Sequence, residues 1–525
     1  MPVRVVRWTK WLLIVLLLAV LAFVGMRAFN ALRGPALQPW HTFVPNELKA
    51  DELDRADWAR YLAREDELMA SVRAEVSQKL PPDARAPINR YFEQSPVYPA
   101  RFKQDWNRSY VLEPAGKPVG VAVFLHGLTD SPYSLRTMAR GYSERGFVAI
   151  GIRMPGHGTV PAGLTDVRWE DWMAATKLAV REARRRVPAP APLHLVGFSN
   201  GGALAMKYSL DALEDPQLPR ADRVILFTPM IGITRFARFA GLAGLPALLP
   251  PFANAAWLSV LPEFNPFKYN SFPVNGARQS YRLTDALQSQ IQRMSRAGQL
   301  SGLPPVLTFQ SVIDFTVSTP AILTALYAHV PDNGSEIVLF DVNRTIKFGP
   351  LLRPSSYVAL DRLVPTTPQT YRFTSIMNAG DDSDATIERS IAPGELSAKS
   401  RPLDLPYPPG IFSLSHLAIP IPMDDPLYGL YPDPKTKNDY GYSLGAMAAR
   451  GERGALMVDQ DFLTRLSANP FFPYLLERIA EGITRPSGPS GRNLAATTAP
   501  GLPVRLEAIL STFSQDTEGQ SFAGP

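Results

Sequence analysis

The sequence predicts an α/β fold in which helices cover both faces of a mostly parallel sheet. Short apolar runs typical of buried strands alternate with amphipathic stretches at helical spacing. The predicted strands are 121–125, 195–198, 224–227, 306–310 and 336–340. The clearest predicted helix is 166–187, which ends at a series of prolines that begins with Pro188.

A serine in a sharp turn follows the predicted strand 195–198. Residues 197–201 read Gly-Phe-Ser-Asn-Gly, and small and apolar residues then open a helix. Gly-x-Ser-x-Gly between a strand and a helix is the signature of a nucleophile elbow, which presents a serine hydroxyl to a base. Gly197 and Gly201 lack the Cβ atoms that would collide in such a turn. The pentapeptide alone also occurs by chance, so its flanks are what make Ser199 the predicted nucleophile.

Further motifs accompany the elbow. They are His-Gly-Leu-Thr-Asp-Ser-Pro at 126–132, Arg-Met-Pro-Gly-His-Gly at 153–158, the loop around Asp314, and Ser-Leu-Ser-His at 413–416. Together these motifs resemble the serine α/β-hydrolases, and within them the monoacylglycerol lipase and carboxylesterase-like branch. The resemblance covers roughly residues 105–430. It implies an α/β-hydrolase fold and a catalytic triad in the chain order serine, acid, histidine.

The resemblance also implies an oxyanion hole built from two backbone N–H groups. One comes from the turn after the early strand 121–125, and the other from the residue directly after the nucleophile. Leu128 and Asn200 occupy these positions. We expect His126 in the same turn to make local hydrogen bonds rather than to move protons.

The catalytic base is sought among six histidines. The family's chain order requires the base to follow Ser199, which leaves His329 and His416. His329 falls inside an apparent helix, 320–330, whereas His416 follows a short strand-like run, 410–415, and enters a loop. Because catalytic residues concentrate on loops at strand ends, His416 is the predicted base and His329 the alternative.

The predicted acid is Asp314, in the loop after the strand 306–310. It would orient the base and stabilise its imidazolium form, and its apolar neighbours Ile313 and Phe315 would shield it from water. Asp341, after the strand 336–340, is the main alternative. The acidic cluster at 381–384 is a weaker one, since it has the composition of a solvated loop.

The amino terminus carries an uncharged apolar run, 11–26, behind three basic residues. A span needs about 20 apolar residues, and this run reaches that length only if Arg27 snorkels to the headgroups. We expect an uncleaved single-pass anchor at 1–35, with a cleaved signal peptide as the alternative. The basic flank favours a cytoplasmic amino terminus. The catalytic domain would then lie outside the cytoplasm, in a bacterium on the periplasmic side of the inner membrane, or be secreted or periplasmic after cleavage.

Composition shifts divide the rest of the chain. We expect a helical N-terminal extension at 36–104 with an amphipathic helix at 49–80, a hydrolase domain at 105–485, an insertion at 342–410, and a disordered tail at 486–525.

A cap at 230–300 is predicted within the hydrolase domain, where some seventy residues separate two strands. Its apolar side chains, among them Phe236, Phe239 and Trp257, suggest an acyl pocket.

Composition also excludes some functions. The net charge of +6 comes from scattered arginines, so we expect no nucleic-acid partner. The chain has no cysteine, which excludes disulfides and thiol chemistry. It shows no metal-ligand spacing and no phosphate-binding glycine loop, so we expect no metal and no cofactor.

These observations predict a serine carboxylic-ester hydrolase that acts on lipid-like or other acyl esters through an acyl-enzyme. Its expected partners are a small-molecule ester or lipid and the membrane; the sequence does not identify protein partners. The alternatives are a thioesterase or acyltransferase with the same triad, and a catalytically silent hydrolase-fold scaffold that recruits a partner through 49–80.

Overall fold

The structure is a computed structural model that describes residues 2–232, 245–347, 351, 353–435, 443–445 and 460–484. The predicted disordered tail at 486–525 lies outside the described residues, as do Phe236 and Phe239 of the predicted cap.

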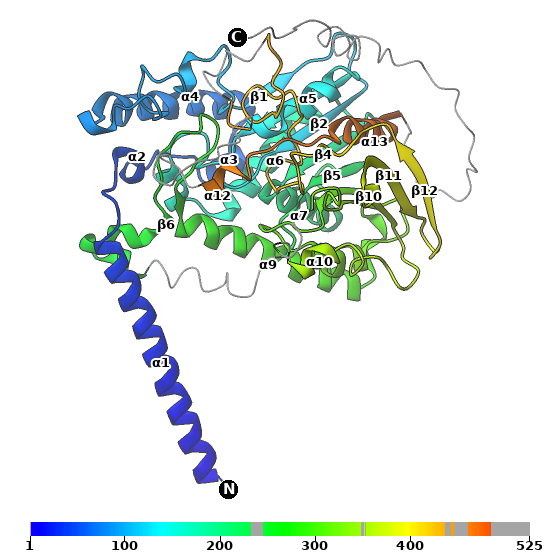
Figure 1. Ribbon diagram of the computed structural model, residues 1–525. Helices are drawn as coiled ribbons and strands as arrows, with labels where there is room; N and C mark the ends of the chain where they lie inside the picture. The colour runs from blue at the N-terminus through cyan, green and yellow to red at the C-terminus, as the bar shows by residue number, and fades with distance from the viewer. Residues whose placement is uncertain are drawn as a thin grey trace, which may run out of the picture. The chain divides into compact units, whose positions relative to one another are not determined.

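A ten-stranded sheet forms the centre of the fold, in the order β1-β3-β2-β4-β5-β8-β9-β10-β11-β12 (Figure 1). From β3 to β10 every neighbouring pair is parallel, while β1, β11 and β12 are antiparallel to their neighbours. The strands are β1 (Tyr110–Leu112), β2 (Gly120–Leu125), β3 (Phe147–Ile152), β4 (Leu193–Phe198), β5 (Arg223–Phe227), β8 (Val306–Ser311), β9 (Glu336–Phe340), β10 (Arg372–Gly380), β11 (Ser383–Ile391) and β12 (Ala398–Leu403). A separate two-stranded sheet pairs β6 (Trp257–Ser259) with β7 (Phe272–Pro273). The mostly parallel sheet is therefore confirmed.

Helices cover both faces of this sheet, whereas α1 (Pro2–Leu32) extends away from it (Figure 1). The other helices are α2 (Pro39–Thr42), α3 (Ala50–Arg55), α4 (Trp58–Glu75), α5 (Arg136–Ser143), α6 (Trp169–Arg186), α7 (Asn200–Glu214), α9 (Val274–Arg296), α10 (Thr319–Ala325), α11 (Pro354–Tyr357), α12 (Gln460–Leu463) and α13 (Phe472–Thr484). Two hydrophobic clusters take side chains from most of these helices: α3, α4, α6, α7, α9 and α10 contribute to one, and α5, α12 and α13 to the other.

The strand β2 shows why both faces must be covered. Val121, Val123 and Leu125 enter the first cluster, whereas Ala122 and Phe124 enter the second. Successive side chains of a strand point to opposite faces, so an all-apolar run such as this one needs helices on each side.

Several predicted elements differ from the structure. The helix expected at 49–80 breaks into α3 and α4, because Asp57 caps the second helix by accepting a hydrogen bond from the Arg60 N–H at 2.8 Å. The helix expected at 320–330 is α10 followed by a single turn, η10 (Tyr327–His329). The run 410–415, expected to be strand-like, forms turns and bends instead, directly after the pair Pro408 and Pro409.

The segment 342–410 extends the main sheet. β10 pairs in parallel with β9, and β11 and β12 follow it in antiparallel order. The inserted residues thus build one edge of the central sheet rather than a separate layer.

A third hydrophobic cluster holds the N-terminal extension against the body. Trp257 is 3% exposed in this cluster, with Trp40, Val72 and Val76 among its neighbours, and its ring lies 4.9 Å from the His41 ring. The prediction that Trp257 lines an acyl pocket is therefore wrong, since its ring packs as core beneath the extension.

The close packing of α7 against β2 and β4 depends on glycine. A Cβ atom added at Gly201 would lie 1.9 Å from the Leu125 carbonyl oxygen, and one added at Gly197 would lie 2.4 Å from the Gly201 carbonyl oxygen. Both obstacles are backbone atoms, so they cannot rotate away. Only glycine lets the helix start this close to the neighbouring strand.

Gly201→Ala should therefore destabilise the fold. Alanine gains about 1 kcal/mol of helix propensity, but the collision with the Leu125 backbone costs roughly 1–3 kcal/mol or more as the elements shift apart. The control is Gly116→Ala, where nothing lies within 4 Å of the added atom. Thermal unfolding in detergent should show a lower Tm for Gly201→Ala and an unchanged Tm for Gly116→Ala; equal Tm values would contradict the close approach.

Candidate active site

Ser199 occupies the turn between β4 and α7 in a strained backbone conformation. Its φ of 55° and ψ of −115° lie where non-glycine residues cost about 1–3 kcal/mol. Two backbone hydrogen bonds hold it there: the Ser199 N–H donates to the Phe227 carbonyl at 2.9 Å, and the Ser199 carbonyl accepts from the Met230 N–H at 3.0 Å. The neighbouring strand β5 thus supports the turn that presents the hydroxyl.

The loop after β2 lies beside this turn. A Cβ atom added at Gly127 would come within 3.3 Å of the Ser199 Cβ. Leu128 follows in this loop, and Asn200 is the first residue of α7, so its N–H has no acceptor within the helix. No hydrogen bond from either N–H occurs among the described residues. The structure thus places Asn200 at the elbow and the residue before Leu128 beside it.

Buried polar contacts fix this loop. Asp130 accepts hydrogen bonds from the Ser134 hydroxyl at 2.8 Å and the Gly127 N–H at 3.4 Å, and its carboxylate lies 3.3 Å from the Lys268 ammonium. On the other side of the elbow, the Ser280 hydroxyl of α9 donates to the Asn200 side-chain oxygen at 2.8 Å.

His126 has a structural role. Burial lowers its pKa to about 3, so the imidazole is neutral. Its Nε2 accepts from the Met154 N–H at 3.0 Å, which leaves Nδ1–H to donate to the Gly127 carbonyl at 2.9 Å. Both ring nitrogens are thus engaged with backbone, in agreement with the predicted local role.

Asp314 and His416 lie together, although 102 positions separate them in the sequence. The Nδ1 of His416 is 2.8 Å from Oδ2 of Asp314, and both side chains are almost fully buried. The other carboxylate oxygen accepts from the backbone N–H groups of Thr316 and Val317 at 2.7 and 3.0 Å. Phe315 is 91% exposed, so the prediction that it shields Asp314 is wrong.

The same contacts set the pKa of the Asp314 carboxyl. Burial alone would raise it, but the charge and hydrogen bond of His416, together with the backbone N–H groups, outweigh burial and lower it below its usual value. Asp314 is therefore ionised at neutral pH and can hold a proton on Nδ1 of His416.

The alternative residues have other partners. Asp341 pairs with the Arg344 guanidinium at 3.0 Å and does not contact His416 in the described part of the chain. His329 bonds through Nδ1 to the Ser295 hydroxyl at 3.0 Å. Neither contact involves a residue of the turn that carries Ser199.

The ring of His416 packs near the nucleophile, with its centroid 5.3 Å from that of Phe198, the residue before Ser199. No hydrogen bond between the Ser199 hydroxyl and His416 is present within the described residues. In unliganded structures such bonds are often long and tighten when substrate binds.

A buried ion pair from the N-terminal extension braces the site and could not be predicted from the sequence. Glu47 pairs with the Arg153 guanidinium at 2.7 Å and also accepts from the Gly156 N–H at 2.8 Å. Arg153 in turn donates to the His157 carbonyl at 2.9 Å. The loop that contacts His126 is thus fixed by a residue some hundred positions earlier, and no local sequence signal indicates such a partner.

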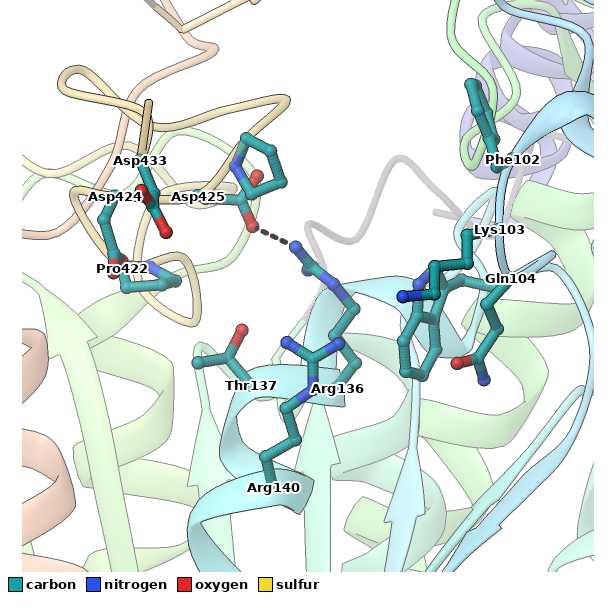
Figure 2. A pocket seen from close by; sticks show the side chains of 12 residues that line it. Phe102, Lys103, Gln104, Arg136, Thr137, Arg140, Pro422, Asp424, Asp425 and Asp433 are labelled. Carbon is teal, nitrogen blue, oxygen red and sulfur yellow. Dashed lines mark hydrogen bonds and ion pairs between the residues drawn. The ribbon is translucent and has the colours of Figure 1, made fainter. Parts of the chain in front are cut away.

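A second buried ion pair links α5, which follows the loop that carries Leu128, to the chain after His416. Arg136 pairs with Asp425 at 2.7 Å, as Figure 2 shows, and the Tyr133 hydroxyl donates to the same carboxylate at 2.9 Å. Arg136 and Asp425 also line a polar cavity of about 480 Å³. Its lining includes Arg140 and Asp433 but none of the predicted site residues.

The residues that the structure describes include no group of acidic, histidine or cysteine side chains suited to hold a metal ion.

Comparison with known proteins shows similarity to serine hydrolases over part of the chain. Residues 116–341 match the family described as serine aminopeptidase, S33. Among curated proteins, the thermostable monoacylglycerol lipase of Bacillus sp. (strain H-257) is 30% identical over 89 residues. That match covers 17% of this chain and 34% of the lipase, so it spans about a third of the relative's length. The predicted resemblance to serine α/β-hydrolases of the lipase and esterase branch is confirmed.

The solved structures that match include a lipolytic enzyme from the metagenome-derived LipS and LipT pair, at 22% identity and a TM-score of 0.36, with 45% of this chain and 88% of that chain covered. A soluble variant of monoglyceride lipase from Saccharomyces cerevisiae is 12% identical with a TM-score of 0.36, covering 44% of this chain and 81% of its own.

The two candidate acids should respond differently to amidation. Asp314→Asn should lower kcat roughly 10⁴-fold, because the amide favours the wrong histidine tautomer, and should barely change Tm. Asp341→Asn should lower Tm, because it removes the buried charge that pairs with the partly buried Arg344, and leave kcat within about threefold of the wild type. Ester-hydrolysis kinetics and thermal unfolding check both variants. A larger kcat loss for Asp341→Asn would reverse the assignment.

Proposed function

We propose that the protein is a membrane-anchored serine carboxylic-ester hydrolase that acts on lipid-like or other acyl esters through an acyl-enzyme. The observation that carries this proposal is the strained Ser199 turn beside the buried pair of His416 and Asp314. Backbone strain of this kind persists only where the surrounding structure holds it, and it is typical of active sites, while the adjacent imidazole supplies a base.

The chemistry follows from the positions of these groups. Because Nδ1 of His416 holds its proton toward Asp314, Nε2 is left as the acceptor for the Ser199 hydroxyl proton. The serine oxygen forms a bond to the ester carbonyl carbon, and the carbonyl oxygen becomes an oxyanion. In the proposed hole, the N–H groups of Leu128 and Asn200 stabilise that charge.

Collapse of this intermediate breaks the bond to the alcohol oxygen, which takes the proton from His416. The acyl group stays on Ser199. A water molecule then gives its proton to His416 and attacks the acyl carbon, and breakdown of the second intermediate returns the proton to Ser199 and releases the carboxylic acid. Asp314 remains ionised through both halves and stabilises the imidazolium each time it forms.

The location is proposed from α1. Its stretch Lys10–Leu32 is long and apolar enough to cross a membrane, although a signal sequence near an amino terminus has the same character. We propose an uncleaved anchor with the catalytic domain outside the cytoplasm, because the basic residues precede the apolar run.

Ser199→Ala should abolish ester hydrolysis, lowering kcat by roughly 10³- to 10⁶-fold with an unchanged Tm, because the triad works as a unit. The substrate is a p-nitrophenyl ester series from acetate to octanoate. Ser209→Ala, at a serine inside the same helix α7, is the matched control and should keep wild-type kcat. Activity of Ser199→Ala near the wild-type level would remove the basis of the proposal.

Carbonate washing of membranes tests the anchor. The full-length chain should stay in the pellet, because a spanning helix resists alkaline extraction, whereas a variant lacking residues 1–35 should be released. Mass spectrometry of the recovered full-length protein should find residue 1 still attached. A chain cut near residue 30 and recovered in the soluble fraction would support signal cleavage instead.

A further inference from the structure

The carboxyl-terminal end of α1 is bound to the segment between β5 and β8. Arg27 donates hydrogen bonds to the carbonyls of Ala255 and Trp257 at 3.2 and 2.8 Å. From the other side, the Asn254 side-chain amide donates to the carbonyls of Ala31 and Pro35, both at 3.1 Å. The helix therefore does not leave the body through a free linker, and the short helix η8 (Pro250–Ala256) and β6 are fixed to its last turns.

This contact changes the expected role of Arg27. The sequence predicts that its side chain snorkels to the lipid headgroups, but the guanidinium instead reaches protein carbonyls. A charge at the end of a span is costly unless it is paired, and backbone carbonyls supply that pairing here.

The contact also indicates how deep η8 and β6 lie relative to the membrane. Leu32 ends the candidate span, and Arg27 lies five residues before it, which is about 7.5 Å along a helix. A hydrocarbon core of roughly 30 Å would use nearly all of the stretch Lys10–Leu32. Because Ala255 and Trp257 lie within hydrogen-bond distance of Arg27, η8 and β6 reach the boundary between headgroups and acyl chains.

The same segment carries exposed apolar side chains. Leu249, just before η8, is 59% exposed, and Leu258, in β6, is 43% exposed. Between them Trp257 is buried in the third cluster, so the segment rests on a packed support. Exposed leucines beside the end of a spanning helix are favourable when acyl chains, rather than water, surround them.

We propose that residues 249–258 form a bilayer-docking segment that enters the leaflet in which α1 ends, so that the hydrolase rests on the membrane surface. The occupant of this apolar surface is the phospholipid bilayer, because the surface is continuous with the anchor helix.

The docking segment leads directly to the candidate active site. Beyond β6 the chain reaches Tyr269, whose N–H donates to the Thr129 carbonyl at 2.7 Å in the loop that carries Leu128. The preceding residue, Lys268, lies 5.8 Å from the ring of Phe198. Resting on the proposed function, the proposal includes that the substrates are esters held in the bilayer leaflet.

A depth measurement tests docking without any assay of catalysis. The chain has no cysteine, so Leu249→Cys and Leu258→Cys each give one site for an environment-sensitive NBD label. The matched control is Leu396→Cys, since Leu396 is 52% exposed in the turn between β11 and β12, which Figure 1 places far from α1. The full-length chain is reconstituted in phosphatidylethanolamine and phosphatidylglycerol vesicles that contain doxyl-labelled lipid.

Docking predicts that doxyl lipid quenches the labels at 249 and 258 strongly, and the label at 396 weakly. Equal quenching at all three sites would overturn the proposal.

An activity ratio tests the link to substrate. The double variant Leu249→Asp and Leu258→Asp should hydrolyse a vesicle-embedded long-chain ester at least about threefold more slowly than the wild type, with an unchanged rate on soluble p-nitrophenyl acetate. Leu396→Asp should change neither rate. An unchanged ratio in the double variant contradicts substrate uptake from the leaflet. If the wild type hydrolyses neither ester, the proposed function fails, while the quenching result still decides the docking.

Discussion

The close approach of β2, β4 and α7 is the constraint on which the rest of the structure depends. Gly197 and Gly201 allow backbone to meet backbone where a single Cβ atom would collide, and the sharp turn then holds Ser199 at a positive φ. The strain of that turn is offset by two hydrogen bonds. The Ser199 N–H donates to Phe227 of β5, and the Ser199 carbonyl accepts from Met230, which follows β5. A fixed elbow is the precondition for bringing a distant histidine within reach of one hydroxyl.

Segments outside the sheet hold the groups around this elbow. Glu47 of the N-terminal extension fixes the loop after β3 through Arg153, and Arg136 joins the oxyanion side to the chain after His416 through Asp425. Each is a buried pair, in which losing one partner leaves an uncompensated charge. Arg465 adds a further brace, since it donates to the Thr316 hydroxyl while its own carbonyl accepts from Ser415. The acid loop and the base loop are thus fixed by the same residue.

Local patterns predicted β2, β4, β5, β8 and β9, the elbow, and the loop positions of Asp314 and His416, because each follows from periodicity or from a turn beside an apolar run. Partners distant in sequence could not be predicted, since nothing near Arg153 or Arg27 indicates which carboxylate or carbonyls they meet. The apolar spacing of 49–80 predicts one continuous helix, because that spacing continues across the cap at Asp57. Trp257 was expected in a pocket because composition alone does not distinguish an acyl lining from a core that packs under an extension.

The most direct test of the account is the position at which a fluorophosphonate probe attaches to the wild-type chain. A serine activated by a neighbouring imidazole attacks phosphorus and becomes covalently phosphonylated, whereas an ordinary serine does not. Peptide mass spectrometry after labelling at neutral pH should find one modified residue, Ser199, and labelling should disappear in His416→Ala. Labelling of another serine, or labelling of Ser199 that persists undiminished in His416→Ala, would contradict the proposed site.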